Sequence, residues 1–275
     1  MRFSTSLPID KINTAQLTLH HAVQFIAASG KYLLEEKEDD SHTNMNWDSG
    51  NKIFYGKSIN NRARVGLHVP TLSLKVNGPT GIELASLSLS GKTKQEGLLW
   101  LRQALQLKQI DSSGLELKMH FEIPEHSTDN DKPFPEVKAT VLEELSNHRT
   151  IADKICSDIF AQHPEATPPR TWPHHFDHGV YVPFQFDDNS EPVRSFSVGY
   201  AVADSVIDEP YFYVTQWKKE EEVDYSKAPE LEHGDWFPEK LKGAALSLSD
   251  ILKMDNQEKK IQDFLNATID FSKTH

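Results

Sequence analysis

Two adjoining runs, "ARVGLHVPTLSLKVNG" (63–78) and "GIELASLSLSG" (81–91), decide the fold class of this 275-residue chain. Apolar and polar residues alternate along both runs, which is the pattern of a strand with one buried face. Turn-forming Asn, Gly and Pro residues separate them, so the two runs predict a hairpin. The sheet that they begin is therefore expected to be antiparallel or mixed.

Helices are expected on both sides of this hairpin. Residues 11–36 and 93–109 carry apolar residues at helical spacing, and a strand is expected at 115–123. The polar segment 124–135, flanked by prolines, leads into a long helix predicted at 136–162. Since strands and helices do not alternate one by one, helices on one side of the sheet are expected rather than a doubly wound parallel sheet.

The second half of the chain is aromatic and extended. After the strand-like runs "GVYVPFQFD", "SFSVGYAVAD" and "EPYFYVTQW", a last helix is predicted at 255–272, with Asp255 and Glu258 as a capping box. The prediction is an α+β fold with antiparallel or mixed sheets packed by an N-terminal helix, one long central helix and a C-terminal helix. We expect a single domain over 1–275, with lobes at 1–130 and 131–275 as the alternative. The first half offers too few strongly apolar strands to close its own core.

Composition narrows the classes of function. The chain has 41 acidic and 29 basic residues, a formal net charge of −12, and no basic stripe interleaved with aromatics, so nucleic acid is not an expected partner. No apolar run is long enough for a membrane span or a signal peptide, so a cytoplasmic location and no membrane partner are expected. The single Cys156 excludes an internal disulfide and a thiolate zinc site. Phosphate-loop, dinucleotide and serine-hydrolase motifs are absent. The oligomeric state is left open.

The densest group of metal-binding side chains is "WPHHFDHG" (172–179). If a helical turn follows Pro173, His174 faces the same way as Asp177 and His178. Two imidazoles with one carboxylate suit zinc, iron or manganese and leave positions for water and substrate. In the structural alternative, His174 caps a turn, Asp177 forms an Asx-turn, and His178 is exposed to solvent.

Further candidates for a ligand site lie elsewhere in the chain. Glu144 and His148 are four residues apart on the apolar stripe of the long helix, where burial is costly unless they pair. We therefore expect Glu144 and His148 either to form a structural hydrogen bond with each other or to belong to a binding site. His20 lies beside the apolar stripe of the first helix, and His21 points to the opposite face. The aromatic segments 170–240 predict either a core of short strands or an aromatic-walled cleft.

Four short motifs carry a resemblance to a known family: "TLHH" (18–21), "WPHHFD" (172–177), "GYAVAD" (199–204) and "DEPYFYV" (208–214). The chain resembles, over nearly its whole length, a bacterial family catalogued as a domain of unknown function. The resemblance implies a single architecture spanning the chain and recurring polar residues at His20, His174 and Asp177. It implies no activity. The additional His175 and His178 depart from the form of the family.

Two functions are compatible with these observations. The first is a soluble cytosolic protein that binds a small-molecule ligand in a sheet-lined aromatic cleft without turnover; the candidate ligand-binding residues are His20, Glu144, His148, Trp172, Tyr211 and Tyr213. The second is a metal-assisted, hydrolase-like enzyme in which His174, Asp177 or His178 bind a divalent Zn, Fe or Mn ion and a bound water is the nucleophile. Stoichiometric metal in the purified protein would favour the second.

Overall fold

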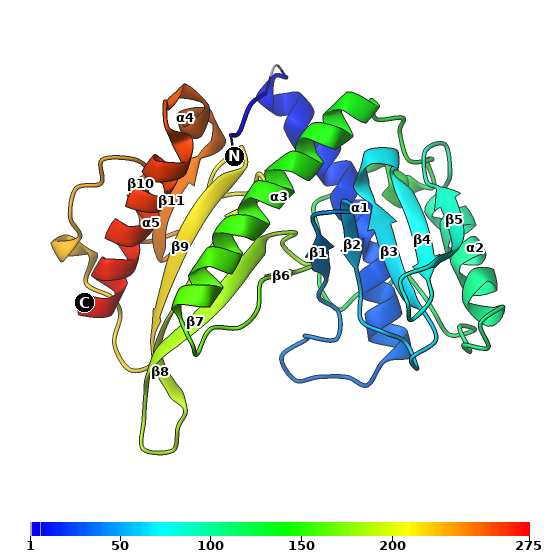
Figure 1. The fold of residues 1–275 in the computed structure, drawn as a ribbon, viewed down its shortest axis with the longest axis horizontal. Coiled ribbons are helices and arrows are strands. Elements are labelled where there is room, and N and C mark those ends of the chain that lie inside the picture. Colours follow the sequence, from blue (N-terminus) through cyan, green and yellow to red (C-terminus); the bar gives the residue numbers. More distant parts are fainter. Residues whose placement is uncertain (1, 6) are drawn as a thin grey trace. The chain divides into compact units, whose positions relative to one another are not determined.

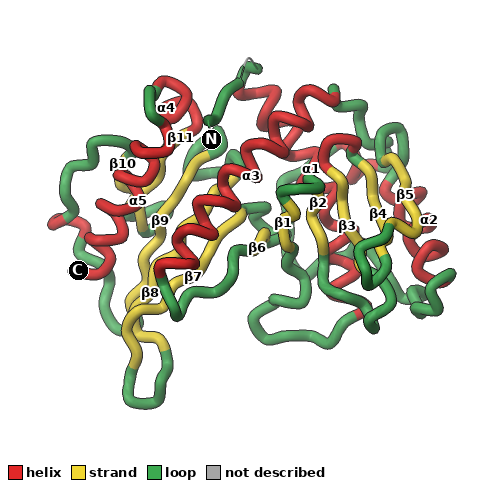
Figure 2. Tube along the Cα trace, in the orientation of Figure 1, coloured by secondary structure: helices red, strands yellow, loops and turns green. Residues whose placement is uncertain are grey.

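The computed structural model describes residues 2–5 and 7–275 and confirms an α+β fold with two antiparallel sheets (Figure 1, Figure 2). The chain forms two compact units. The N-terminal unit comprises Asp10–Thr150 and Arg170–Phe176; the C-terminal unit comprises Ile151–Pro169, Asp177–His275 and the N-terminal segment up to Ile9. The division lies within the long helix rather than at residue 130, and the chain returns briefly to the N-terminal unit.

The N-terminal unit is built on a five-stranded antiparallel meander, in which each strand pairs with the next along the chain. The register places Val65 opposite Val76 and Leu67 opposite Leu74, and all four are buried on one face. The elements are α1 (Ile9–Leu33), β1 (Asn46–Asp48), β2 (Ile53–Tyr55), β3 (Arg64–His68), β4 (Ser73–Asn77), β5 (Glu83–Ser88), α2 (Lys94–Gln106), the first part of α3 (Ala139–Gln162), and β6 (Arg170–Thr171).

The run 63–78 forms two strands, where the sequence pattern predicts one. A 3₁₀ turn at Val69–Thr71 separates β3 from β4, and Leu72 adopts a positive φ of 44°. Pro70 lies within this turn, and proline has no N–H to donate to a strand ladder. The region therefore holds two successive hairpins, β3–β4 and β4–β5.

The strand expected at 115–123 is not formed, and that prediction is wrong. Residues 107–138 contain one short 3₁₀ turn at Ser127–Asn130 and are otherwise irregular. Side chains of the helices take the place of a neighbouring strand: Arg102 donates to the carbonyl of Leu115, and Lys31 and Tyr32 both donate to the carbonyl of Lys118, at 2.8 and 2.9 Å.

The C-terminal unit has an antiparallel sheet in the order β10-β11-β9-β8-β7. Helices α3 and α5 lie across one face (Figure 1). The register aligns Val180, Val198 and Val214 beneath them, and all three are buried. The elements are the second part of α3, β7 (His178–Phe186), β8 (Pro192–Ala201), β9 (Tyr211–Lys218), β10 (Asp235–Phe237), β11 (Gly243–Ser247), α4 (Leu248–Lys253) and α5 (Gln257–Thr274).

Helix α5 begins two residues later than predicted, and its capping box is absent. The N-cap is Asn256, with a φ of 42° and no side-chain cap bond, whereas Asp255 pairs with Lys260 at 2.7 Å. A capping box is found instead on α2, between Thr93 and Glu96. The apolar stripe predicted for α5 is buried, as expected, at Ile261, Leu265, Thr268 and Ile269.

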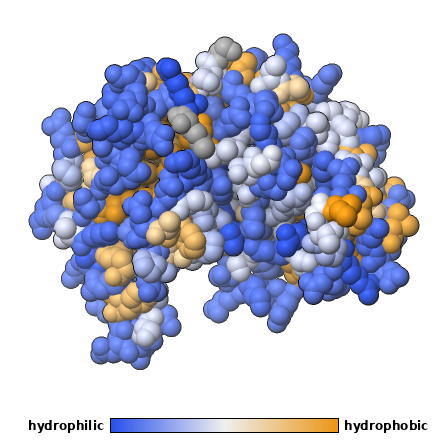
Figure 3. Space-filling model, viewed as in Figure 1, coloured by the Kyte–Doolittle hydropathy of each residue, from blue (hydrophilic) through white to orange (hydrophobic). Residues whose placement is uncertain are grey.

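The face of the molecule drawn in Figure 3 is mostly hydrophilic, with apolar colour in limited patches. This distribution agrees with the charged fraction of the chain, 25%, which is typical of a globular protein. Across the part of the chain that the structure describes, none of the helices combines the length and the apolar composition needed to cross a bilayer.

Candidate functional site

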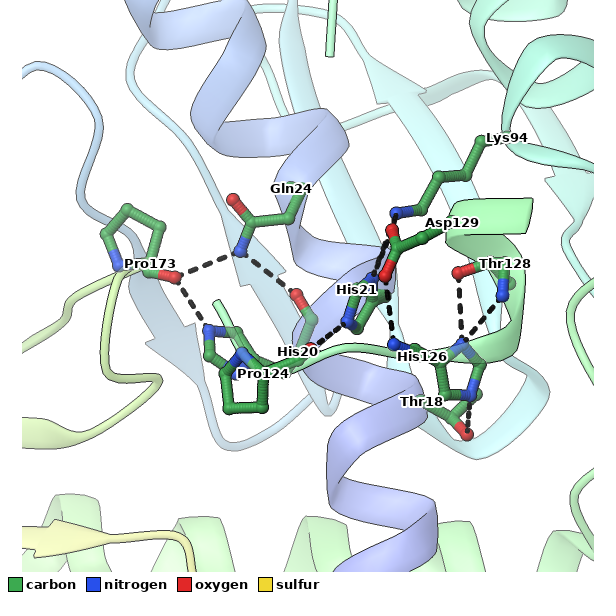
Figure 4. A network of polar contacts seen from close by, with 10 residues as sticks. All are labelled: Thr18, His20, His21, Gln24, Lys94, Pro124, His126, Thr128, Asp129 and Pro173. Atoms are coloured by element: carbon green, nitrogen blue, oxygen red, sulfur yellow. Dashed lines mark hydrogen bonds and ion pairs between the residues drawn. The ribbon is translucent and has the colours of Figure 1, made fainter. Parts of the chain in front are cut away.

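The "WPHHFD" motif forms a helical turn that is fastened to α1 (Figure 4). The N–H of Phe176 donates to the carbonyl of Trp172 at 2.8 Å, so the turn predicted after Pro173 is present. The carbonyl of Pro173 accepts two hydrogen bonds, from Nε2 of His20 at 2.8 Å and from Nε2 of Gln24 at 2.9 Å. The "TLHH" and "WPHHFD" motifs therefore meet through a backbone carbonyl.

Phe176 ends this turn in the left-handed region, with a φ of 55°, and is held on both sides. The His20 ring stacks on it at a centroid distance of 5.2 Å, and the Arg149 guanidinium lies 4.7 Å from the Phe176 ring. Arg149 also donates to the Phe176 carbonyl at 3.1 Å. Burial lowers the pKa of His20 to about 4, against the opposing effect of its hydrogen bond to Pro173. His20 is therefore a neutral packing residue at pH 7.

The remainder of the motif belongs to the C-terminal unit and has other partners. Asp177 accepts a hydrogen bond from the Tyr213 hydroxyl at 2.5 Å, and Nε2 of His178 lies 3.1 Å from Oδ1 of Asp153. The expectations of an Asx-turn at Asp177 and an exposed His178 are wrong. His178 is the first residue of β7, and residues two apart on a strand share a face. Its side chain therefore points to the helix-covered face, as that of Val180 does, and it is fully buried.

The three metal candidates are not gathered into a coordination group. His174 lies beside Trp172 and Phe121, at centroid distances of 6.0 and 5.7 Å, whereas Asp177 and His178 contact other side chains. Over residues 2–5 and 7–275, no three His, Cys, Asp or Glu side chains are placed to hold one metal ion.

Tyr213 lies across two glycines to reach Asp177. A Cβ atom at Gly199 would be 2.5 Å from the Tyr213 hydroxyl, and one at Gly179 would be 2.8 Å from it. Burial and the Asp177 charge raise the pKa of Tyr213 well above its ordinary value. Tyr211 donates to Asp204 at 2.7 Å, and burial raises its pKa as well. Both tyrosines are thus neutral donors, and their hydrogen bonds hold β9 to Asp177 and Asp204.

The hydrogen bond predicted between Glu144 and His148 is not formed. His148 is buried, and Oε1 of Glu144 is buried without a hydrogen-bond partner among the residues described. Both lie in the N-terminal unit, on the part of α3 before Thr150.

His21 belongs to a polar network that the sequence did not reveal (Figure 4). Its Nε2 donates to the carbonyl of Pro124 at 2.8 Å, and its Nδ1 accepts from Lys94 at 2.9 Å. Lys94 also pairs with Asp129, which accepts the backbone N–H of His126 at 2.9 Å. Burial, more than the Lys94 charge, lowers the pKa of His21 to about 4. The network fastens the irregular segment to α1, and no periodic pattern in that segment indicated that it would cover this face.

A groove lies on the other face of the C-terminal sheet, away from the helices. Two cross-strand rows contribute to its lining: Tyr181, Ser197 and Thr215 in one, and Ser195 and Trp217 in the next. Small residues on the central strand β8 are thus flanked by aromatic side chains on β7 and β9. These two strands are about 10 Å apart, since adjacent strands are separated by about 4.8 Å. The groove has a volume of about 470 Å³, within the range of ligand pockets.

The hydrogen-bonding groups of this groove are not used by the protein. Among the described residues, the hydroxyls of Ser195, Ser197 and Thr215 have no hydrogen-bond partner, nor do the Tyr181 hydroxyl and the Trp217 indole N–H. Tyr181 and Trp217 are 37% and 48% exposed. The lining includes one acidic residue, Glu191, and no basic one.

The groove lies within the aromatic segments 170–240, yet none of the predicted ligand residues lines it. Tyr211 and Tyr213 share the groove's face of the sheet with Tyr181 and Trp217 by strand alternation. Val206, Ile207, Phe237 and Leu241 pack over the Tyr211 end, which leaves the Trp217 end open.

Comparison with family models, curated proteins and solved structures finds no match for this chain.

Proposed function

We propose that the protein binds a small, neutral, polyhydroxylated ring, such as a sugar, in the groove on the C-terminal sheet. The observation that carries the proposal is the set of unused hydrogen-bonding groups on β8 and β9 between two exposed aromatic rings. Ligand sites combine apolar walls with a few placed polar groups, and an aromatic face can pack against the C–H face of a ring while its polar edge stays hydrated.

The charge of the lining favours a neutral ligand. A phosphate or carboxylate would find no basic side chain there, and Glu191 would repel it. Cleavage of a glycosidic bond ordinarily requires two flanking carboxylates, and the described lining offers one. Binding without turnover is therefore the function that we propose.

The test measures binding of unmodified hexoses, N-acetylglucosamine and common disaccharides by saturation-transfer NMR and titration calorimetry. Trp217→Ala removes one wall and Ser197→Leu fills the floor, so each is expected to weaken binding at least about tenfold, the equivalent of one lost packing or hydrogen-bonding contact. Ser86→Leu, on an exposed position of β5, and Leu107→Ala, at an 81% exposed position, are the controls and should bind as the wild type does.

Two results would contradict the proposal. One is the absence of binding by any sugar at millimolar concentration. The other is wild-type affinity in both Trp217→Ala and Ser197→Leu.

A further inference from the structure

A second cavity lies where β9 runs past the start of β11. Strand β11 begins at Gly243, opposite Thr215, while β9 continues to Lys218. The cavity has a volume of about 370 Å³. Its lining comes from the end of β9 and from the segments that follow β9 and precede β11: Gln216, Trp217, Lys218, Glu221, Glu222, Val223, Asp224, Tyr225, Pro238, Glu239 and Lys242.

Gln216 is the unusual member of this lining. It is only 6% exposed, and both its Oε1 and its Nε2 are buried without a hydrogen-bond partner among the described residues. Its backbone N–H donates to Lys242 at 2.9 Å, so the strand is paired normally and only the side-chain amide is left unused. Buried amides in folded proteins almost always have partners, because a desolvated donor or acceptor without one is destabilising.

Tyr225 adds a third unused group to the same cavity. Its hydroxyl is buried without a hydrogen bond in the described part of the chain, and burial raises the pKa of Tyr225 to about 12. The hydroxyl is therefore protonated at neutral pH and can donate. The ring is held in place by Trp236 and Phe271, at centroid distances of 5.8 and 6.0 Å.

We infer that this cavity binds a neutral carboxamide, whose C=O and N–H pair with the Gln216 side-chain amide. An amide presents one acceptor oxygen and one donor nitrogen side by side, and a second amide edge complements both at once. A carboxylate accepts only, so it would leave Oε1 of Gln216 unpaired. It would also enter a lining with four carboxylates, Glu221, Glu222, Asp224 and Glu239, in which the two lysines already pair with Glu221 and Glu222.

This site is distinct from the groove of the proposed function. Side chains at successive strand positions point to opposite faces, so Gln216 lies on the other side of the sheet from Ser195 and Ser197. Trp217 lines both cavities, so a Trp217 variant would not distinguish binding in the groove from binding in the second cavity.

The probe is benzamide, titrated into the full chain and followed by calorimetry and amide chemical-shift changes. Acetophenone, in which a methyl group replaces the NH₂, is the matched ligand control and should bind at least about tenfold more weakly, since it cannot donate to Oε1 of Gln216. Gln216→Met keeps the size of the side chain and removes both polar atoms; it should abolish the benzamide response while raising the melting temperature of the ligand-free protein. Tyr225→Phe should weaken benzamide binding.

Ser197→Leu, which fills the groove, should leave benzamide binding unchanged, so failure of one site is distinguishable from failure of the other. The inference is overturned if benzamide does not bind the wild type, because the cavity then holds only water. It is also overturned if Gln216→Met binds benzamide with unchanged affinity, or if acetophenone binds as tightly as benzamide.

Discussion

At the scale of single residues, hydrogen-bond partners decide what each histidine does. His20 and His21 are adjacent on α1, and each donates from Nε2 to a proline carbonyl, of Pro173 and Pro124 respectively. A carbonyl oxygen can only accept, so this contact fixes the tautomer of both rings. Burial then keeps both rings neutral at pH 7, which makes them packing residues of the N-terminal unit.

These two histidines predict a loss of stability in weak acid. Their pKa values are lowered from 6.5 to about 4 in the folded chain, so between these values the unfolded chain binds protons that the folded chain excludes. The free energy of unfolding should therefore be fully retained above pH 6.5 and fall as the pH falls toward 4, by up to about 3 kcal/mol for each residue.

Urea unfolding at pH 7 and at pH 5 measures this effect. His20→Gln should be less stable than the wild type at pH 7 but should lose less stability on acidification. Leu107→Ala, at an 81% exposed position without a titratable side chain, is the control and should keep the wild-type pH dependence. If His20→Gln had the same pH dependence as the wild type, folding would not lower the pKa of His20, and the prediction would be wrong.

At the scale of elements, the small residues of β8 shape the sheet. Gly199 lets the Tyr213 ring of β9 lie flat across the strand and reach Asp177. Further along the same strand, Ser197 and Ser195 leave the space that becomes the groove. A strand of larger residues would have closed this space and displaced Tyr213.

Gly199→Ala should lower the free energy of unfolding by about 1–3 kcal/mol, the usual cost of overpacking. The new Cβ would lie 2.5 Å from the Tyr213 hydroxyl and 2.8 Å from the His178 carbonyl oxygen, and the latter is backbone that cannot move cheaply. Gly114→Ala is the control, because nothing lies within 4 Å of a Cβ at that position. Chemical denaturation compares the two, and equal stability would mean that Tyr213 does not depend on the glycine.

At the scale of the whole molecule, the two units are interleaved in sequence. The chain leaves the N-terminal unit within α3 and returns to it at Arg170–Phe176. That returning segment pairs with Met45 through Thr171, at 2.9 and 2.8 Å, and supplies the Pro173 carbonyl that His20 and Gln24 bind. Met45, His20 and Gln24, all early in the chain, thus have hydrogen-bond partners in a segment that lies beyond residue 169.

A fragment of residues 1–130 should therefore not unfold cooperatively, whereas residues 10–176 should. The shorter fragment lacks the Phe176 ring and the Pro173 acceptor as well as the first part of α3. Urea unfolding followed by circular dichroism and by dispersion of amide resonances measures the difference. A cooperative transition in residues 1–130 would show that the returning segment is dispensable for folding.

The alternating and helical patterns of the sequence determined the fold class, four of its helices and the strand-rich second half, because each pattern reports which face of one element is buried. They also identified the aromatic segments 170–240, which were compatible with either a core of short strands or an aromatic-walled cleft. They could not locate the strand break at Pro70, the burial of His178 or the role of His21, which depend on what packs against each element.

The candidate sites were decided by tertiary structure. The groove exists because β8 brings Ser195 and Ser197 between Tyr181 and Trp217, which are 36 positions apart in the chain. The second cavity lies where β9 continues past Gly243, the first residue of β11, and the buried Gln216 side chain there has no hydrogen-bond partner among the described residues. Strand register and the coverage of a face are properties of contacts distant in sequence, and local periodicity carries no information about them.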